Sequence, residues 1–213
     1  MDINLLGHSA RCCAELVDEA GHTEVAPAGV ASSVPPPLAP QAPSVEPSRS
    51  EFSRRNIDVP RGTVRIWWLG VHGGAGETTL AQLLESSWET GHAWPQTDGQ
   101  ATELPQVILV ARTNARGLRA AQLAAIEWAS GSVAVRLQGL ALIADAPGRL
   151  PRPLRDLAHV VAGGVPRVWR LPWVEAWRLG EPVCVETAPK AITTFLDELR
   201  ASYLTAPTSI PIS

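Results

Sequence analysis

A glycine-rich loop between an apolar strand and a helical segment constrains the fold of this chain more than any other feature. Residues 70–79 read Gly-Val-His-Gly-Gly-Ala-Gly-Glu-Thr-Thr. The apolar run at 64–69 has the composition of a buried strand, and apolar residues at helical spacing from 78 to 90 predict a helix closed by Gly91. Backbone N–H groups in such a loop, with the helix dipole behind them, form a concave anion site. The sequence therefore predicts a strand, a phosphate-cradling loop and a helix.

The candidate binding residues belong to the loop and the first helical turn: Gly73, Gly74, Ala75, Gly76, Glu77, Thr78 and Thr79. Thr78 holds the position whose hydroxyl binds Mg²⁺ in nucleotide-binding loops, whereas Glu77 replaces their phosphate-binding lysine. At contact distance and an effective dielectric of about 20, that reversal of charge changes the Coulomb energy by several kcal/mol. We therefore expect no tight triphosphate binding in the ordinary manner. Two alternatives stay open: weak binding of ATP or ADP with Mg²⁺, or a tight turn with no cofactor, in which Glu77 suits the first turn of a helix.

Apolar runs alternate with helical patterns through the rest of the chain. Strands are predicted at 106–111, 139–144 and 165–171, and helices at 117–130, 154–162, from 173 onward and at 190–202. Continuous apolar strands separated by helices are typical of a parallel sheet with helices on both faces, which binds ligands at the carboxyl ends of its strands. The sequence thus predicts an α/β domain over residues 59–203.

The N-terminal quarter of the chain has a different composition. Residues 22–58 are rich in proline, alanine and serine and cannot bury enough apolar surface to offset the entropy of ordering, so we interpret them as a disordered linker. Residues 1–21 are interpreted as a tail that could form a short helix, and residues 204–213 as a C-terminal tail.

Composition excludes several classes of protein. The three cysteines and five histidines have neither disulfide nor metal spacing, which favours a reduced cytoplasm and no zinc site. No apolar stretch reaches 18 residues, so no membrane span is expected. The domain is close to neutral and shows no basic face, which argues against autonomous nucleic-acid binding.

The loop resembles one particular group of ATPases. Residues 72–79 are similar to the variant loop of the ParA and MinD ATPases, with the two lysines of that loop replaced by His72 and Glu77. Over residues 60–202 the chain resembles a degenerate member of this group, close to an uncharacterised actinobacterial family of P-loop-like proteins whose function is unassigned. The resemblance implies a truncated P-loop NTPase-like fold that has lost the segment carrying the switches. His72 is expected to face solvent in the loop.

Asp145 follows the strand predicted at 139–144 and precedes a Pro-Gly turn, so it is expected at the same edge of the sheet as the loop. The resemblance implies two alternative roles for Asp145: the Walker B carboxylate that holds the water shell of Mg²⁺, or a residue that contacts the nucleotide base. The short segment at 91–105 between the first helix and the next strand favours the second role over the first. A third alternative, independent of the resemblance, is a turn or helix cap.

These patterns favour a protein that binds partners over an enzyme. Trp169, Trp173 and Trp177 recur every four residues among arginines, which is the composition of interaction surfaces as well as of filled cores. The leading hypothesis is a non-hydrolysing P-loop protein that binds an unidentified protein partner, a second copy of itself included, and nucleotide weakly; the resemblance implies DNA partitioning or maintenance. The alternatives are a slow ATPase completed by a cation from its partner, and a structural interaction domain with an empty loop.

Overall fold

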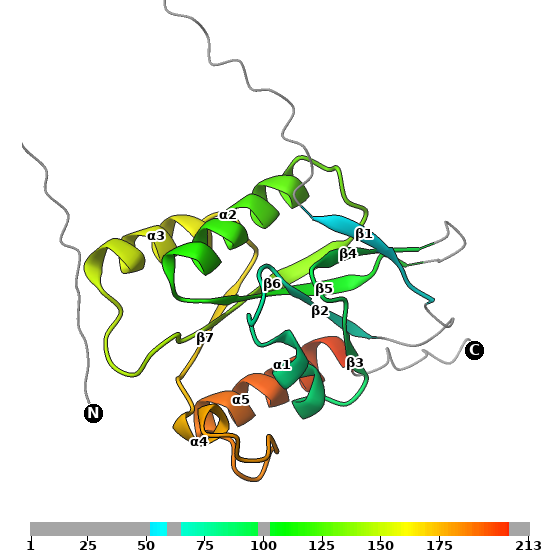
Figure 1. Ribbon diagram of the computed structural model, residues 1–213. Coiled ribbons are helices and arrows are strands. Elements are labelled where there is room, and N and C mark those ends of the chain that lie inside the picture. Colours follow the sequence, from blue (N-terminus) through cyan, green and yellow to red (C-terminus); the bar gives the residue numbers. More distant parts are fainter. Residues whose placement is uncertain (1–51, 59–64, 98–102, 205–213) are drawn as a thin grey trace, which may run out of the picture. The chain divides into compact units, whose positions relative to one another are not determined.

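The computed structural model describes residues 52–58, 65–97 and 103–204, and Figure 1 shows how their elements are arranged. The predicted tail at 1–21, most of the predicted linker and the residues after 204 lie outside this part of the chain. In chain order the elements are β1 (Ser53–Asn56), β2 (Ile66–Gly70), α1 (Glu77–Leu83), β3 (Ser87–Glu89), β4 (Ala93–Gln96), β5 (Gln106–Arg112), α2 (Ala115–Ala129), β6 (Arg136–Ile143), α3 (Arg152–Ala162), β7 (Val168–Leu171), α4 (Glu175–Arg178), α5 (Lys190–Leu199) and the π-helix η1 (Arg200–Leu204).

Five strands form one parallel sheet in the order β3-β2-β5-β6-β7, and β1 and β4 form a separate parallel pair. From β2 the chain moves outward to β3, whereas from β5 it moves the opposite way to β6 and β7. The strand order therefore reverses between β2 and β5. Ligands of open α/β sheets bind at such a reversal, outside the carboxyl ends of the strands. The glycine loop follows β2 at this edge.

Helices cover both faces of the main sheet, as the sequence predicts: α2 and α3 on one side, α1 and α5 on the other (Figure 1). The side chains of β2 alternate accordingly, since successive residues of a strand point to opposite faces. Trp67 and Leu69 belong to the core under α2 and α3, and Ile66 and Trp68 to the core under α1 and α5. Each of these four side chains is at most 7% exposed, so β2 is anchored from both sides.

The helix predicted for residues 78–90 is wrong in its second half. Helix α1 ends at Leu83, Ser86 has a φ of 60°, and the chain then enters strand β3. Trp88 lies opposite Trp67 in the ladder with β2, with their rings 5.9 Å apart, and the guanidinium of Arg65 lies 4.2 Å from the centre of its ring. Helical spacing placed Trp88 on a helix, but its packing against β2 makes it a strand residue.

The end of the predicted linker also forms regular structure. Residues 53–56 are the strand β1, which pairs with β4. Phe52 packs edge-on against Trp94 at 6.3 Å, and Arg54 forms a 2.8 Å ion pair with Glu127 of α2. The strand carries no apolar pattern because its residues are exposed, so it depends on these distant partners.

Candidate functional site

The loop between β2 and α1 is held by two glycines in conformations that other residues rarely adopt. Gly74 has a φ of 74° and Gly76 a φ of 106°. The N–H of Ala75 donates to the carbonyl of His72 at 3.1 Å and closes a turn around Gly74. A Cβ on Gly76 would lie 2.7 Å from Cδ1 of Ile143, so Gly76 also permits close packing against β6. The loop therefore needs glycine at these two positions for its own conformation, whether or not it binds a ligand.

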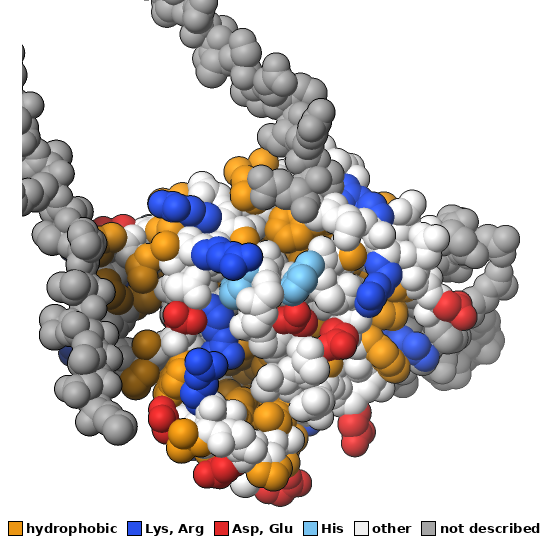
Figure 2. Space-filling model, viewed as in Figure 1, with side chains coloured by type: hydrophobic (Ala, Val, Ile, Leu, Met, Phe, Trp, Pro, Cys, Tyr) orange, Lys and Arg blue, Asp and Glu red, His pale blue; other side chains and the backbone are white. Residues whose placement is uncertain are grey.

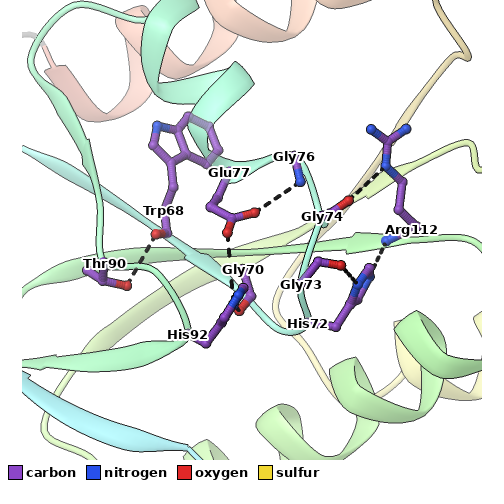
Figure 3. A network of polar contacts seen from close by, with 10 residues as sticks. All are labelled: Trp68, Gly70, His72, Gly73, Gly74, Gly76, Glu77, Thr90, His92 and Arg112. Atoms are coloured by element: carbon purple, nitrogen blue, oxygen red, sulfur yellow. Dashed lines mark hydrogen bonds and ion pairs between the residues drawn. The ribbon is translucent and has the colours of Figure 1, made fainter. Parts of the chain in front are cut away.

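The carboxylate of Glu77 folds back onto the loop (Figure 3). Its Oε2 accepts a hydrogen bond of 3.0 Å from the backbone N–H of Gly76, and the residue is only 8% exposed. A Cβ on Gly70 would lie within 2.6 Å of both carboxylate oxygens, so the carboxylate rests directly on the backbone of that glycine. The carboxylate of Glu77 thus occupies the N–H group of Gly76, which a bound anion would otherwise use.

His92 completes this arrangement from the connection between β3 and β4. Its Nδ1–H donates to the carbonyl of Gly70 at 2.6 Å, and the same nitrogen lies 3.8 Å from Oε1 of Glu77 (Figure 3). The neighbouring Thr90 donates to the carbonyl of Trp68 at 3.2 Å through its hydroxyl. The end of β2 is therefore tied to a segment more than twenty residues away.

The expectation that His72 faces solvent is wrong. His72 is 8% exposed, and its Nε2 accepts the backbone N–H of Arg112 at 3.0 Å. With Nε2 as the acceptor, the ring proton lies on Nδ1, which donates to the carbonyl of Gly73 at 3.0 Å. His72 is buried because its ring lies between the loop and the end of β5 and bridges the two.

Arg112, which the sequence analysis did not single out, places a cation beside the loop. Its Nε donates to the carbonyl of Gly74 at 3.4 Å and its Nη1 to the carbonyl of Ala144 at 3.1 Å. Burial lowers the pKa of Arg112 most, Asp145 opposes that shift, and Arg178 lowers the pKa further. The sequence held one signal for Arg112: an arginine directly after a predicted strand, at the edge of the sheet where the glycine loop is also expected.

The remaining predicted site residues are divided between the surface and a cleft. Thr78 is exposed, whereas Thr79 lines the cleft. Asp145 is exposed and lines the cleft as well; its carboxylate accepts a 3.1 Å hydrogen bond from Asn114, and its N–H donates to the hydroxyl of Thr113 at 3.1 Å. Asn114 in turn caps α2 by accepting the N–H of Gly117. Asp145 therefore lies against the start of α2, at the edge of the sheet that the sequence predicts.

The cleft has a volume of about 360 Å³ and lies between the loop and the segment that follows β7. Gly74, Thr79 and Arg112 line one side, and Trp177 and Arg178 the other. A smaller cavity of about 300 Å³ lies beyond Asp145, towards α3. Figure 2, viewed from the same side as Figure 1, shows basic, acidic and histidine side chains close together near the centre of this face. The candidate site is thus a loop closed by Glu77 beside an open cleft.

Within the described residues, no helix has both the length and the apolarity needed to cross a membrane. The same part of the chain holds no cluster of three or more histidine, cysteine, aspartate or glutamate residues arranged to bind a metal ion.

Comparison with models of protein families identifies the family of this chain. The model of a family of unknown function (DUF6668) matches residues 64–195, which is more than half of the chain and includes both the loop and the cleft. No curated protein and no solved structure matches the chain.

Proposed function

The chain belongs to the DUF6668 family, and we propose that it is a non-hydrolysing P-loop-like protein that acts by binding a partner. The observation that carries this proposal is the buried carboxylate of Glu77, which accepts the N–H of Gly76 and rests on Gly70. A phosphate in the loop needs the same N–H group and the same space. Glu77 then acts as a permanent internal anion in the loop.

Charge supports the same conclusion. If Glu77 stayed in place, a phosphate at about 4 Å would meet a repulsion of about 4 kcal/mol per pair of unit charges at an effective dielectric of about 20. If Glu77 left, the hydrogen bond to Gly76 and the packing on Gly70 would be lost. The first route removes about half of the affinity of a micromolar ligand, about 8 kcal/mol, and the second costs about 1 kcal/mol, the net value of one hydrogen bond.

The surroundings of the loop give hydrolysis little support. The Mg²⁺ position of the sequence analysis, Thr78, is exposed, and the carboxylate of Asp145 is engaged by Asn114. Catalysis of phosphoryl transfer depends on cations and a metal held around the phosphates. The proposed function is therefore binding, with nucleotide at most a weak ligand.

The resemblance to the ParA and MinD group extends the proposal to a cytoplasmic role in DNA partitioning or maintenance, through a protein partner. A second copy of the chain is the simplest such partner. Light scattering of the full chain measures this directly: a mass of twice 22.7 kDa supports a homodimer, and a mass of 22.7 kDa requires a different protein.

Calorimetric titration with Mg·ATP and Mg·ADP tests the closed loop. We expect at most weak binding to the wild-type chain and to Glu77→Gln, which retains the shape of the side chain, and tighter binding to Glu77→Lys, which supplies the missing cation. Binding by wild type followed by phosphate release contradicts the proposal. Failure of the Lys variant to bind, with its thermal unfolding unchanged, removes nucleotide from the proposal and leaves partner binding alone.

A further inference from the structure

The cleft beside the loop has features of a ligand site that Glu77 does not block. Its volume of about 360 Å³ falls within the range of small-molecule sites, about 300–1,000 Å³. We propose that it binds a flat aromatic compound that carries a single anionic group and needs no metal ion. This inference rests on the proposed function, because a loop closed by Glu77 leaves the cleft as the place where an anion can be held.

Two arginines, one from each side of the cleft, provide the positive charge for an anion. Arg112 comes from the end of β5 and Arg178 from the last turn of α4, and both line the cavity. Among the described residues no carboxylate oxygen lies within 4.0 Å of either guanidinium in an ion pair. Burial lowers the pKa of Arg112 most; Asp145, which also lines the cleft, opposes that shift, and repulsion from Arg178 adds to it. An anion bound between the two arginines offsets their repulsion and accepts charge-assisted hydrogen bonds from both.

The geometry of Arg112 fixes where this anion is held. Its Nε and Nη1 donate to the carbonyls of Gly74 and Ala144, which anchors the guanidinium between the loop and the end of β6. Its Nη2 lies 3.7 Å from the position of a Cβ on Gly76. Arg112 is therefore preorganised by the backbone on both sides, so little side-chain entropy is lost when an anion binds.

The wall opposite the loop is aromatic. Trp173 and Trp177 line the cleft after β7, and the indole N–H of Trp173 donates to Glu175, which restrains its ring. The Nε1 of Trp177 is buried and has no hydrogen-bond partner in the described part of the chain. Indole faces stack with other flat rings, and an unpaired buried donor favours a ligand that brings an acceptor. The ring of the ligand therefore lies on this side.

The chemistry of the two sides together selects the ligand class. An aromatic ring on the tryptophans and one anionic group on the arginines describe a nucleoside monophosphate or an aromatic carboxylate. A polyphosphate chain gains nothing, because the neighbouring loop already contains the Glu77 carboxylate. Ile143, Leu171 and Ile192 also line the cleft and suit the flat ring, while the carboxylate of Asp145 in the same lining disfavours a second negative charge.

Calorimetric titration of the full-length chain in EDTA tests the inference. The probes are AMP, its two halves adenosine and inorganic phosphate, and indole-3-acetate as the aromatic carboxylate. We expect binding of AMP or of indole-3-acetate, whichever carries the preferred anion. Adenosine and phosphate should bind at least tenfold more weakly than that ligand. Arg178→Gln should weaken binding by roughly tenfold or more, the usual value of a hydrogen bond to a charged group.

The matched control is Arg119→Gln. Arg119 is exposed like Arg178 and its replacement changes the net charge equally, but it does not line the cleft. We expect it to leave binding unchanged. The inference is overturned if neither AMP nor indole-3-acetate binds, if adenosine binds as tightly as AMP, or if both arginine variants weaken binding equally. In those cases the proposed function still stands, whereas hydrolysis of Mg·ATP by wild type overturns the proposed function and, with it, the closed loop on which this inference rests.

Discussion

The loop after β2 and the cleft beside it differ in how their polar groups are satisfied. In the loop, Glu77 holds the N–H of Gly76, and both ring nitrogens of His72 are engaged by the chain. In the cleft, Arg178 lacks an ion pair and Trp177 a hydrogen-bond partner among the described residues. A ligand gains free energy only from groups that are not already paired. The conspicuous loop is therefore the weaker candidate site, and the inconspicuous cleft the stronger one.

The largest expected effect comes from removing the backbone freedom on which the loop depends. Gly76→Ala should lower the free energy of unfolding by about 2–5 kcal/mol, because a left-handed residue with a side chain costs about 1–2 kcal/mol and overpacking against Ile143 adds about 1–3 kcal/mol. Urea unfolding followed by tryptophan fluorescence measures it. Gly73→Ala, where a Cβ meets nothing, is the control and should change stability by about 0.5 kcal/mol or less. Equal losses would mean that the loop is not held in this conformation.

The two histidines of the loop provide the next comparison. His72→Ala leaves the backbone N–H of Arg112 without its acceptor and should cost about 1–3 kcal/mol. His92→Ala should cost less, about 1 kcal/mol, because the His92 side chain is 49% exposed and water can replace its hydrogen bond. The same urea experiment ranks the two variants. A larger loss for His92 would contradict the structural role assigned to His72.

Displacing Glu77 without changing its charge sharpens the comparison between a closed and an open site. Gly70→Ala places a methyl group 2.4 Å from Cδ of Glu77, so the flexible side chain should swing out of the loop. We expect a loss of about 1 kcal/mol, the net value of one hydrogen bond, and faster hydrogen exchange at the Gly76 amide by NMR. Glu77→Gln, whose amide oxygen can still accept from Gly76, should exchange more slowly than Gly70→Ala. Unchanged exchange in both would show that the carboxylate does not protect this amide.

The smallest effect is expected in the cleft. Trp177→Phe removes an indole N–H that has no partner in the described part of the chain, so stability should change by about 1 kcal/mol or less, in either direction. Trp68→Phe is the matched substitution at a paired indole, whose N–H donates to Ser87 at 2.8 Å, and should cost about 1–3 kcal/mol. Thermal unfolding of the two variants side by side tests this. Equal losses would mean that the N–H of Trp177 has an acceptor after all.

Local patterns predicted the parts of the fold that depend on neighbouring residues. The apolar run before the loop forms β2, the run at 106–111 forms most of β5, and the helix predicted at 117–130 is α2 within a few residues. These elements were predictable because buried parallel strands are continuously apolar and a helix of this length shows its 3.6-residue period. The edge of the sheet at which the loop lies followed from the same alternation.

Elements that depend on distant partners were missed. Strand β1 has no apolar pattern and is held by β4, and Trp88 fits helical spacing, which wrongly predicts a helix where the chain forms β3. The cleft was missed for the same reason. Arg112 and Arg178 are far apart in the sequence, and nothing local to either indicates that both line one cavity.

The sequence by itself determined that a glycine loop joins a buried strand to a helix and that Glu77 stands where a phosphate-binding loop has a cation, because residue identity and short-range periodicity decide both. Only the tertiary structure decided where the charges point. The Glu77 carboxylate turns onto Gly70 because that glycine leaves space for it, and Arg112 reaches the loop across 38 residues of chain because β5 lies beside β2. Side-chain direction depends on contacts between distant segments, which sequence spacing does not contain.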